Sequence, residues 1–327
     1  MAAKTRWGIM GTGRIAHKFA DALAVLPDAE LVAVGSRTAA AAEKFGAEFK
    51  APRRYGSYAE LARDRNVDAI YISTPHPLHR ENTLLCLQAG RAVLCEKPFA
   101  INAVDAEAMV ACAQAKRVFL MEAMWSHFFP AMAKVRELLA AGAIGEVRLV
   151  RADFCFRAGL DPASRLFDPA LGGGAILDVG VYTVALAHMI YGREPEHVAA
   201  LAHLGETGVD EQTAMLLGYE RGALAVLTCA VRTNATHAAA IYGTDGWIEL
   251  PPVFWQPDRI VLHAGGKDEE LKFDRLGNGY TYEAQEVGRC LREGRLESEV
   301  MPHAKTLAIM RTLDRVRAAV GLKYPGE

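Results

Sequence analysis

The chain has 327 residues, of which 51% are hydrophobic and 23% are charged, and its formal net charge at pH 7 is −2. This length suits two domains of ordinary size, and the composition is typical of a globular protein rather than a disordered or fibrous one. Basic and acidic residues are mixed along the chain, which argues against a nucleic-acid partner.

The sequence shows neither a membrane-spanning run nor an export signal. No apolar run approaches the roughly 20 residues that cross a bilayer, and the first residues lead into a strand-like segment without a secretory apolar core. We therefore expect a cytoplasmic protein without a membrane partner. The six cysteines are widely spaced and form no C-x-x-C pair, so we expect reduced, mostly buried thiols and no metal site.

Up to residue 123, apolar strand-like segments alternate with helical patterns. We expect strands at 6–10, 31–35, 68–73, 92–95 and 118–121, and helices at 15–26, 38–45, 78–89 and 103–115. Such alternation predicts βαβ units and a parallel sheet, with ligands at the carboxyl ends of its strands.

After residue 123 the pattern changes to strand-like segments joined by short turns. We expect strands at 147–154, 198–203, 211–217, 223–228, 238–242 and 259–263, and helices at 131–141, from the glycines at 172–174 to 189, at 282–291 and at 304–320. The turn residues at 219–222 and 244–246 predict hairpins. Residues 124–327 are therefore expected to form an α+β domain with a mainly antiparallel open sheet.

A G-x-G-x-x-A pattern lies between the first expected strand and the first expected helix. The first glycine permits a tight turn, the second lets backbone N–H groups approach a pyrophosphate, and the small last residue lets the helix pack on the strand. The residues are Gly11, Thr12, Gly13, Arg14, Ile15 and Ala16. They predict a dinucleotide site in a Rossmann domain spanning 1–123, the alternative being a tight turn without a ligand.

The end of the second expected strand distinguishes the two nicotinamide cofactors. An acidic residue there would bind the ribose hydroxyl of NAD, but this chain has Ser36, Arg37 and Thr38. A hydroxyl and a guanidinium match the 2′-phosphate of NADP. We predict NADP rather than NAD, the alternative being a solvated surface arginine.

Lys97 follows the strand expected at 92–95, in the segment Cys95-Glu96-Lys97-Pro98. At the carboxyl end of a strand, an ammonium group can donate to a substrate hydroxyl and stabilise a developing alkoxide. We predict that Lys97 is catalytic, although a lone lysine in a turn is commonly a surface residue.

Three glycines at 172–174 precede Asp178 and Tyr182, which are four residues apart and should share one face of a helix. Glycines let the backbone approach a ligand or a neighbouring strand closely. A phenol has a pKa near ~10, and an adjacent ammonium lowers that pKa, so Tyr182 beside Lys97 would be a plausible proton acceptor. The alternative is a half-buried core tyrosine.

These motifs resemble the Gfo/Idh/MocA family of oxidoreductases over essentially the whole chain. The resemblance lies in GTGRIA at 11–16, TPHPLH at 74–79, EKP at 96–98 and GGGAILDVGVY at 172–182. It implies a Rossmann domain and an α+β domain whose open sheet mediates dimers or tetramers.

The resemblance also implies roles for individual residues. Lys97 would be the catalytic lysine, Asp178 a substrate-orienting acid and Tyr182 the general acid/base. The other implied residues belong to the cofactor site: Thr74, Pro75 and His79 in the cleft, Glu96 and Lys97 by the nicotinamide, and Arg165 at the nicotinamide end.

Tyr182 stands where many family members carry histidine, and with the segment 122–130 it is similar to the dihydrodiol dehydrogenase and NADP-dependent D-xylose dehydrogenase branch. That branch commonly has arginine where this chain has His127, and His127 has either a binding or a structural role.

We therefore expect an NADP-dependent oxidoreductase that transfers a hydride to or from a sugar or a small diol. Two alternatives are a sensor or regulator of the same fold that binds NADP without catalysis, and a sugar–sugar oxidoreductase with tightly held NADP.

Overall fold

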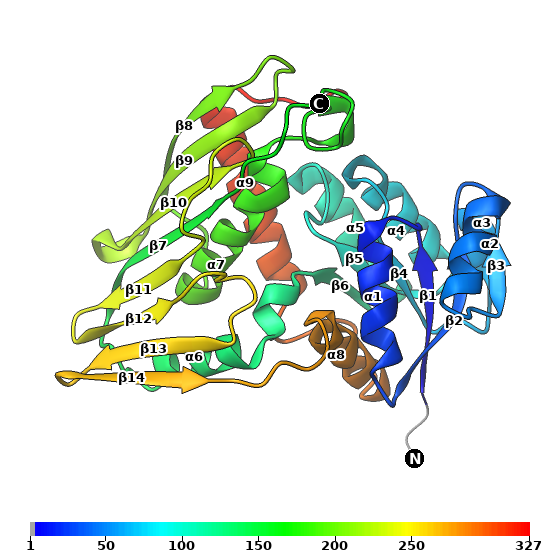
Figure 1. The fold of residues 1–327 in the computed structure, drawn as a ribbon, viewed down its shortest axis with the longest axis horizontal. Coiled ribbons are helices and arrows are strands. Elements are labelled where there is room, and N and C mark those ends of the chain that lie inside the picture. Colours follow the sequence, from blue (N-terminus) through cyan, green and yellow to red (C-terminus); the bar gives the residue numbers. More distant parts are fainter. Residues whose placement is uncertain (1–3) are drawn as a thin grey trace. The chain divides into compact units, whose positions relative to one another are not determined.

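A computed structural model describes residues 4–327, which divide into two compact units (Figure 1). The first unit comprises the described residues up to Ala100 together with Val104–Trp125 and Arg275–Thr306. The second comprises Ile101–Ala103, Ser126–Asp274 and Leu307–Glu327. The start of the chain, which entered the expectation of no export signal, lies partly outside the described residues.

The first unit contains a six-stranded parallel sheet with the order β3-β2-β1-β4-β5-β6. This is the strand order of a dinucleotide-binding Rossmann sheet, as the alternating pattern predicts. Its strands are β1 (Thr5–Met10), β2 (Ala29–Gly35), β3 (Arg53–Tyr55), β4 (Ala69–Ile72), β5 (Ala92–Glu96) and β6 (Leu120–Ala123). Its helices are α1 (Arg14–Ala24), α2 (Ala39–Glu48), α3 (Tyr58–Arg63), α4 (His79–Gln88) and α5 (Ala103–Lys116).

Two of these elements, β3 and α3, are absent from the sequence-based expectation because both are short. The strand β3 has only three residues, Arg-Arg-Tyr, and forms the edge of the sheet beside β2. The six-residue helix α3 is capped by Ser57, whose hydroxyl accepts a hydrogen bond from the backbone N–H of Glu60. Neither offers enough apolar residues to show a period.

The sequence predicts one division of the chain, at residue 123, whereas the compact units change after Trp125 and exchange further segments at Ile101–Ala103 and at Arg275–Thr306. Residues 275–306 belong to the first unit, and their helix α8 (Tyr280–Arg292) packs against α1 and β2. Val287 and Cys290 are fully buried there. Because any amphipathic helix can cover any apolar surface, the local pattern predicts α8 but not the unit that it covers.

The second unit contains an eight-stranded sheet with the order β14-β13-β12-β11-β7-β10-β9-β8. All pairings are antiparallel except β7 with β10. The strands are β7 (Val147–Cys155), β8 (His197–Leu204), β9 (Asp210–Gly218), β10 (Leu224–Ala230), β11 (Ala239–Gly243), β12 (Gly246–Leu250), β13 (Arg259–Ala264) and β14 (Lys267–Lys272). The mainly antiparallel open sheet and both predicted hairpins are confirmed.

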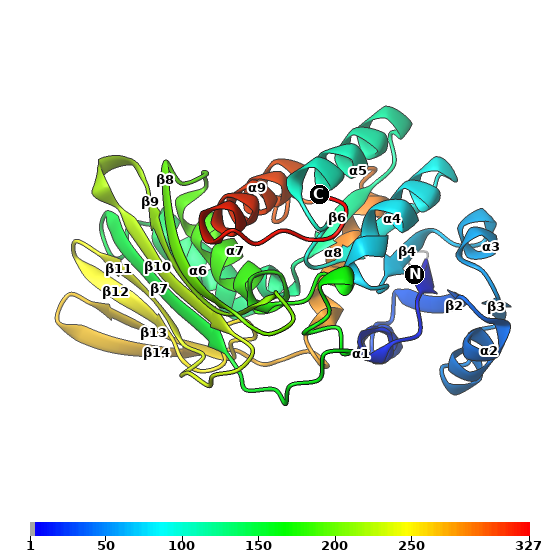
Figure 2. The same cartoon turned by 90° about the horizontal axis from the view of Figure 1, so that it is seen from above.

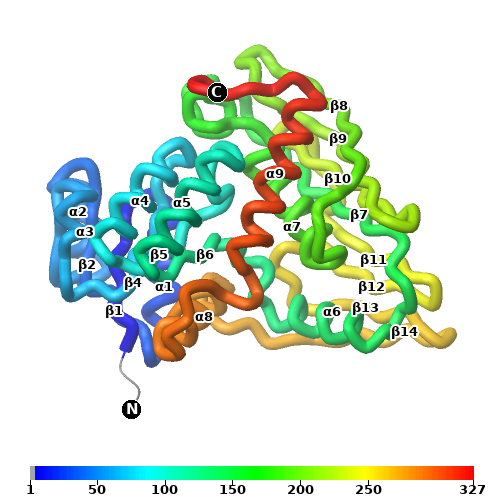
Figure 3. Tube along the Cα trace, turned by 180° about the vertical axis from the view of Figure 1, so that it is seen from behind, coloured from blue at the N-terminus to red at the C-terminus, as the bar shows by residue number. Residues whose placement is uncertain are grey.

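The helices of this unit lie on one face of its sheet (Figure 2). They are α6 (Pro130–Ala140), α7 (Val181–Tyr191) and most of α9 (His303–Val320), and α7 contacts β7 and β10. Figure 3 shows α9 beside α7, and the ring of His188 lies 2.8 Å from the hydroxyl of Thr312 between them. The strands β12 and β14 were not expected; β14 has the sequence KDEELK, which lacks an apolar face.

One segment, Pro169–Tyr191, is long and apolar enough to cross a membrane by length and composition, contrary to the sequence-based expectation. In the second unit, however, 89% of its most apolar window is buried. Buried core helices commonly have the same length and apolar composition.

Candidate active site

The glycine loop joins β1 to α1 in the conformation that the motif predicts. Gly11 has a φ of +103°, and a Cβ on it would lie 3.0 Å from Oγ and 3.2 Å from the carbonyl oxygen of Ser73. Its N–H donates to the carbonyl oxygen of Gly35 on the neighbouring strand, at 2.9 Å. Glycine is therefore required both for the left-handed backbone and for the close approach to Ser73.

The first turn of α1 is open to an anion. Gly13 precedes the helix without a side-chain cap, no acidic residue lies in the first turn, and a Cβ on Gly13 would meet no atom within 4 Å. Backbone N–H groups at a helix start attract phosphate through hydrogen bonding and the helix dipole. The loop from Gly11 to Ile15 therefore fits a dinucleotide phosphate.

Ser36, Arg37 and Thr38, from which the sequence predicts NADP, lie at the end of β2. Ser36 is buried and its Oγ lies 3.4 Å from Oγ1 of Thr12, whereas Arg37 and Thr38 are exposed. The Thr38 hydroxyl accepts a hydrogen bond from the N–H of Ala41 and so caps α2. Arg37 is thus the exposed cation at this strand end, where an NAD-specific site would place an acid.

Glu96, the last residue of β5, has its carboxylate bonded inside the first unit. It accepts hydrogen bonds from the hydroxyl of Tyr71 and, at 3.2 Å, from the backbone N–H of Lys97. Burial, together with the Glu96 carboxylate, raises the pKa of Tyr71 well above its usual value. The carboxylate of Glu96 therefore holds the start of the Lys97 segment, and its side chain is only 6% exposed.

His79 joins the two loops that follow β4 and β5. Its ring is fully buried, with Nε2 2.8 Å from the carbonyl oxygen of Thr74 and Nδ1 2.9 Å from that of Pro98. Thr74 is also buried, and its hydroxyl accepts from the amide of Asn82 at 3.0 Å. The resemblance implied that His79 lines the cofactor cleft; in the structure its buried ring contacts the backbone of the segments that carry Thr74 and Pro98. Pro75 is exposed.

In the second unit, the glycines at 172–174 were expected to let the backbone approach either a ligand or a neighbouring strand. The structure shows a close approach to a strand. A Cβ on Gly173 would lie 2.8 Å from the carbonyl oxygen of Leu166. Gly174 has a φ of +106°, and a Cβ on it would lie 2.2 Å from Oδ1 of Asp210 at the start of β9. The glycines therefore make room for a carboxylate of the protein itself.

Asp210 is a functional candidate that sequence reasoning missed. Its Oδ2 accepts hydrogen bonds from the backbone N–H of Ile176 at 2.9 Å and from the hydroxyl of Thr213 at 2.8 Å. The side chain is fully buried, and burial raises its pKa to about 7 despite these bonds. It fixes the start of the helix that carries Asp178 and Tyr182; the only sequence signal was an acidic residue before an apolar strand.

Asp178 and Tyr182 do not lie on one regular α-helix. Residues Ile176–Gly180 form a π-helical turn, and α7 continues from Val181. π-helical turns, with i→i+5 bonding, occur frequently at functional sites. Both side chains are nearly buried, with 5% and 6% of Asp178 and Tyr182 exposed.

Arg165 pairs with the proposed substrate-orienting acid. Its Nη1 lies 2.7 Å from Oδ1 of Asp178, and its side chain is 51% exposed. The resemblance placed Arg165 at the nicotinamide end of the cofactor; within the second unit its partner is Asp178. The pair keeps a guanidinium beside the carboxylate of Asp178.

An aromatic wall of Phe154, Trp255 and His237 lies beside Tyr182. Phe154 and Trp255 are stacked, with centroids 3.4 Å apart and an interplanar angle of 8°. The Tyr182 ring lies 5.4 Å from Phe154 and 6.4 Å from Trp255. A flat apolar surface next to a phenol suits a ring-shaped substrate.

His127, whose role was left open, is buried in the short turn Trp125–Phe128, and its carbonyl oxygen accepts a hydrogen bond from Arg136 at 2.8 Å.

The cysteines are mostly buried, as expected: five of the six are buried and Cys112 is half-buried. None of them forms a disulfide in the structure. Within residues 4–327, no group of three His, Cys, Asp or Glu side chains is placed to hold a metal ion.

Comparison with known proteins identifies the family of both parts of the chain. Residues 5–124 match the family described as an oxidoreductase family with an NAD-binding Rossmann fold, and residues 132–249 match the GFO/IDH/MocA C-terminal domain. The chain is 42% identical over 331 residues to trans-1,2-dihydrobenzene-1,2-diol dehydrogenase from Mus musculus, covering 98% of both proteins. It is 38% identical to the protein of the same name from Homo sapiens, again over 98% of each.

Solved structures show the same fold. An aldose-aldose oxidoreductase from Caulobacter crescentus, complexed with glycerol, has a TM-score of 0.89 at 26% identity over 97% of this chain and 98% of that one. KijD10, a 3-ketoreductase from Actinomadura kijaniata in complex with NADP and TDP-benzene, has a TM-score of 0.87 at 26% identity, with the same coverage.

The fold, the glycine loop and these relatives define an NAD(P)-dependent oxidoreductase that acts on CH–OH groups. The chain belongs to the Gfo/Idh/MocA family of oxidoreductases. The resemblance read from its motifs is thereby confirmed.

Proposed function

We propose that this protein transfers a hydride between NADP and a secondary alcohol or hemiacetal carbon of a sugar or a trans-dihydrodiol. The observation that carries the proposal is the Tyr182 ring beside the aromatic wall, with Asp178 and Arg165 on the same segment of the second unit. The dihydrodiol dehydrogenases with which the chain shares 38–42% identity favour a ring-shaped diol.

The preference for NADP rests on the end of β2. Arg37 is exposed there and Ser36 provides a hydroxyl beside Thr12, so a 2′-phosphate would meet a cation and hydrogen-bond donors. The phosphates between the two nucleosides would be bound by backbone N–H groups from Gly11 to Ile15, and Glu96, Thr74 and His79 would hold the loops on the nicotinamide side. KijD10, with which the fold is shared, is described in complex with NADP.

The chemistry is divided among three side chains. NADP, when bound, would supply the hydride acceptor or donor. The Lys97 ammonium donates to the reacting oxygen and stabilises negative charge on it, while the Asp178 carboxylate orients the substrate by accepting from its hydroxyl. Tyr182 takes the hydroxyl proton during oxidation and returns it during carbonyl reduction.

The direct test is a panel of aldoses and trans-diols, mixed with each cofactor and followed by the absorbance of reduced nicotinamide. We expect turnover with at least one ring-shaped polyol or diol and a higher kcat/KM with NADP than with NAD. A protein that binds NADP but turns over no member of the panel would support the sensor alternative, against which the presence of Lys97, Asp178 and Tyr182 argues.

A second candidate function is hydride exchange between two sugars with tightly held NADP. The structural similarity to an aldose-aldose oxidoreductase favours it. Protein that retains NADP through purification and reduces one sugar while oxidising another would support this reaction; protein purified without cofactor would exclude it.

We also propose that the protein is a homodimer or homotetramer built on the open face of the second unit's sheet. Apolar side chains are exposed on strands of this sheet: Leu201 (82%), Leu216 (45%), Val226 (41%) and Trp247 (41%). Leu216 and Val226 are cross-strand partners on β9 and β10, and large exposed apolar patches mark interaction sites. Sedimentation of the wild type and of Leu216→Glu tests it, because a monomeric wild type would contradict the proposal.

A further inference from the structure

His237 is the one member of the aromatic wall that lies in a strained backbone conformation. Its φ is +62°, in the left-handed region that residues other than glycine seldom occupy. Such a conformation persists where surrounding contacts impose it, and it is found often at functional sites.

The contacts that impose it are hydrogen bonds on both sides of the residue. The His237 N–H donates to Oδ1 of Asp153 at 2.6 Å, and its carbonyl oxygen accepts from the N–H of Phe254 at 3.0 Å. Asp153 lies on β7 and Phe254 directly precedes Trp255. The backbone of His237 is therefore held between the strand and the loop that carry the two stacked rings of the wall.

The ring of His237 is fixed by a third hydrogen bond. Its Nε2 lies 2.5 Å from the carbonyl oxygen of Cys155, which can only accept, so Nε2 carries the proton. In the neutral ring, Nδ1 then bears the lone pair and is a hydrogen-bond acceptor. Within residues 4–327, Nδ1 has no hydrogen-bond partner.

The position of this acceptor relates it to Tyr182. The His237 ring lies 5.5 Å from Phe154 and 5.1 Å from Trp255, and the Tyr182 ring lies 5.4 Å and 6.4 Å from the same two rings. Phenylalanine offers no hydrogen bond and the tryptophan indole offers only a donor. The wall thus combines an apolar stacked pair with a single ring acceptor, and both His237 and Trp255 are half-buried rather than sealed.

We propose that Nδ1 of His237 accepts a hydrogen bond from a substrate hydroxyl other than the one that is oxidised. His237 is then a specificity-determining residue that favours polyhydroxylated rings, such as cyclic sugars, over six-membered rings carrying only a vicinal diol. This inference rests on the proposed function, in which Tyr182 exchanges the proton of the reacting hydroxyl.

The test compares D-xylose with trans-cyclohexane-1,2-diol, which both present six-membered rings but differ in the number of hydroxyl groups. kcat/KM is measured with NADP for the wild type, His237→Phe and His237→Gly. The phenylalanine variant keeps an aromatic ring without the acceptor, and the glycine variant removes the side chain while accommodating the left-handed backbone without strain.

In both variants we expect kcat/KM for D-xylose to fall by about tenfold, mainly through KM, because one hydrogen bond to the substrate is lost. For the cyclohexanediol we expect a change within about twofold. A general disturbance of the wall would lower kcat/KM for both substrates by the same factor. Such an equal loss would overturn the inference, and so would an unchanged ratio of the two kcat/KM values.

The glycine variant keeps the test valid if the larger phenylalanine prevents folding. A wild type that turns over both compounds, with the same preference in the glycine variant, would overturn only the role of His237. A wild type that turns over neither of these compounds nor any other member of the panel of aldoses and trans-diols would overturn the proposed function and this inference with it.

Discussion

Lys97 and Glu96 are consecutive residues with different tasks, and the structure separates them. The Glu96 carboxylate is engaged by Tyr71 and by the N–H of Lys97, so it serves the positioning of the segment. The Lys97 side chain, to which the proposed reaction assigns the positive charge, is half-buried at the same strand end. In the second unit Asp178 is likewise held by Arg165, while the ring of Tyr182 lies along the aromatic wall.

Replacing the catalytic groups should affect turnover far more than cofactor binding. For Lys97→Ala and for Tyr182→Phe we expect kcat to fall by roughly 10²–10⁴, the usual range for lost acid–base assistance. Steady-state kinetics measures the loss, and fluorescence titration with NADPH checks that the cofactor still binds. Near-normal turnover in Lys97→Ala would contradict its assignment.

Arg37 should determine which cofactor is preferred. Arg37→Asp removes the cation for a 2′-phosphate and adds an acceptor for a ribose hydroxyl, so the ratio of kcat/KM for NADP to that for NAD should fall by at least about tenfold. Arg14→Asp, at an exposed position in the glycine loop, is a matched change of charge. A similar fall of this ratio in both variants would show that the overall electrostatic potential of the site, rather than Arg37 itself, sets the cofactor preference.

At the scale of elements, the segment from Gly172 to α7 explains how the active-site helix begins. Gly174 leaves space for Asp210, whose carboxylate accepts a hydrogen bond from the backbone N–H of Ile176 at the start of the π-helical turn. Gly180 lets that turn approach β10 closely, since a Cβ there would lie 2.9 Å from Sγ of Cys229. The placement of Asp178 and Tyr182 is thus a property of strands and helix together.

A methyl group at Gly174 should disturb this segment. Gly174→Ala combines a positive φ with a clash against Asp210, so backbone strain and overpacking should lower stability by more than about 1 kcal/mol and should also lower kcat. Gly142→Ala is the control, because Gly142 has a φ of +70° but a Cβ there would meet no atom within 4 Å. Equal losses of Tm in the two variants would show that backbone strain alone is responsible.

Asp210 should make stability depend on pH. Its folded-state pKa of about 7 lies above the usual value of 3.8, so the folded protein keeps a proton that the unfolded chain releases. The free energy of unfolding should therefore decrease as the pH rises from about 4 to about 7. Asp210→Asn, which resembles the protonated form, should become more stable relative to the wild type over this range, as measured by urea unfolding. A constant difference would contradict a raised pKa.

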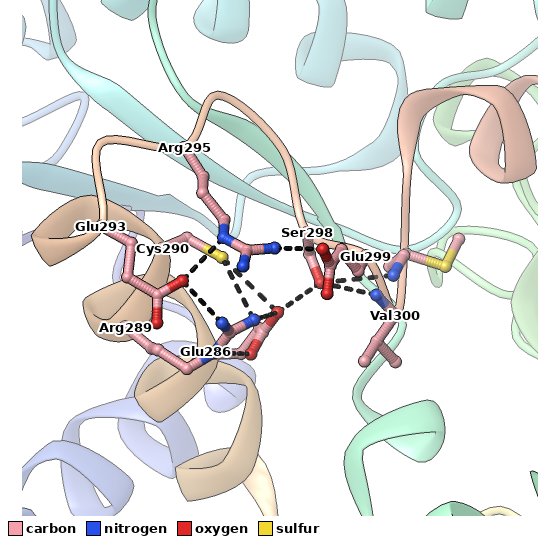
Figure 4. A network of polar contacts seen from close by, with 9 residues as sticks. Glu286, Arg289, Cys290, Glu293, Arg295, Ser298, Glu299 and Val300 are labelled. Atoms are coloured by element: carbon pink, nitrogen blue, oxygen red, sulfur yellow. Dashed lines mark hydrogen bonds and ion pairs between the residues drawn. The ribbon is translucent and has the colours of Figure 1, made fainter.

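At the scale of the whole molecule, the chain returns to its first unit after completing the second. The end of the returning helix α8 is fastened by a polar network around Glu286, which accepts hydrogen bonds from Arg289 and from Ser298 (Figure 4). Burial opposes ionisation of Glu286, but these bonds outweigh it and lower its pKa. The network ties α8 to the residues that lead into α9.

Loss of this network should destabilise the protein. Glu286→Ala leaves the Ser298 hydroxyl and the Arg289 guanidinium without their shared acceptor, and we expect about 1–3 kcal/mol of destabilisation. The control Glu299→Ala removes an exposed partner of Arg295 shown in the same network and should have little effect. Thermal unfolding measures both; equal effects would argue against a role for the buried acceptor.

The Rossmann topology, the glycine loop and the residues proposed for chemistry are predictable from the sequence alone, because each depends on local backbone geometry or on strand ends that a parallel sheet aligns. The family is predictable too, through motifs that span both units. Three features follow only from the folded structure: α8 packs on the first unit, His79 is buried, and Asp210 bonds the start of the segment Ile176–Gly180. Those outcomes depend on contacts between residues far apart in the chain, where burial and close packing select one partner among many that the local pattern allows equally.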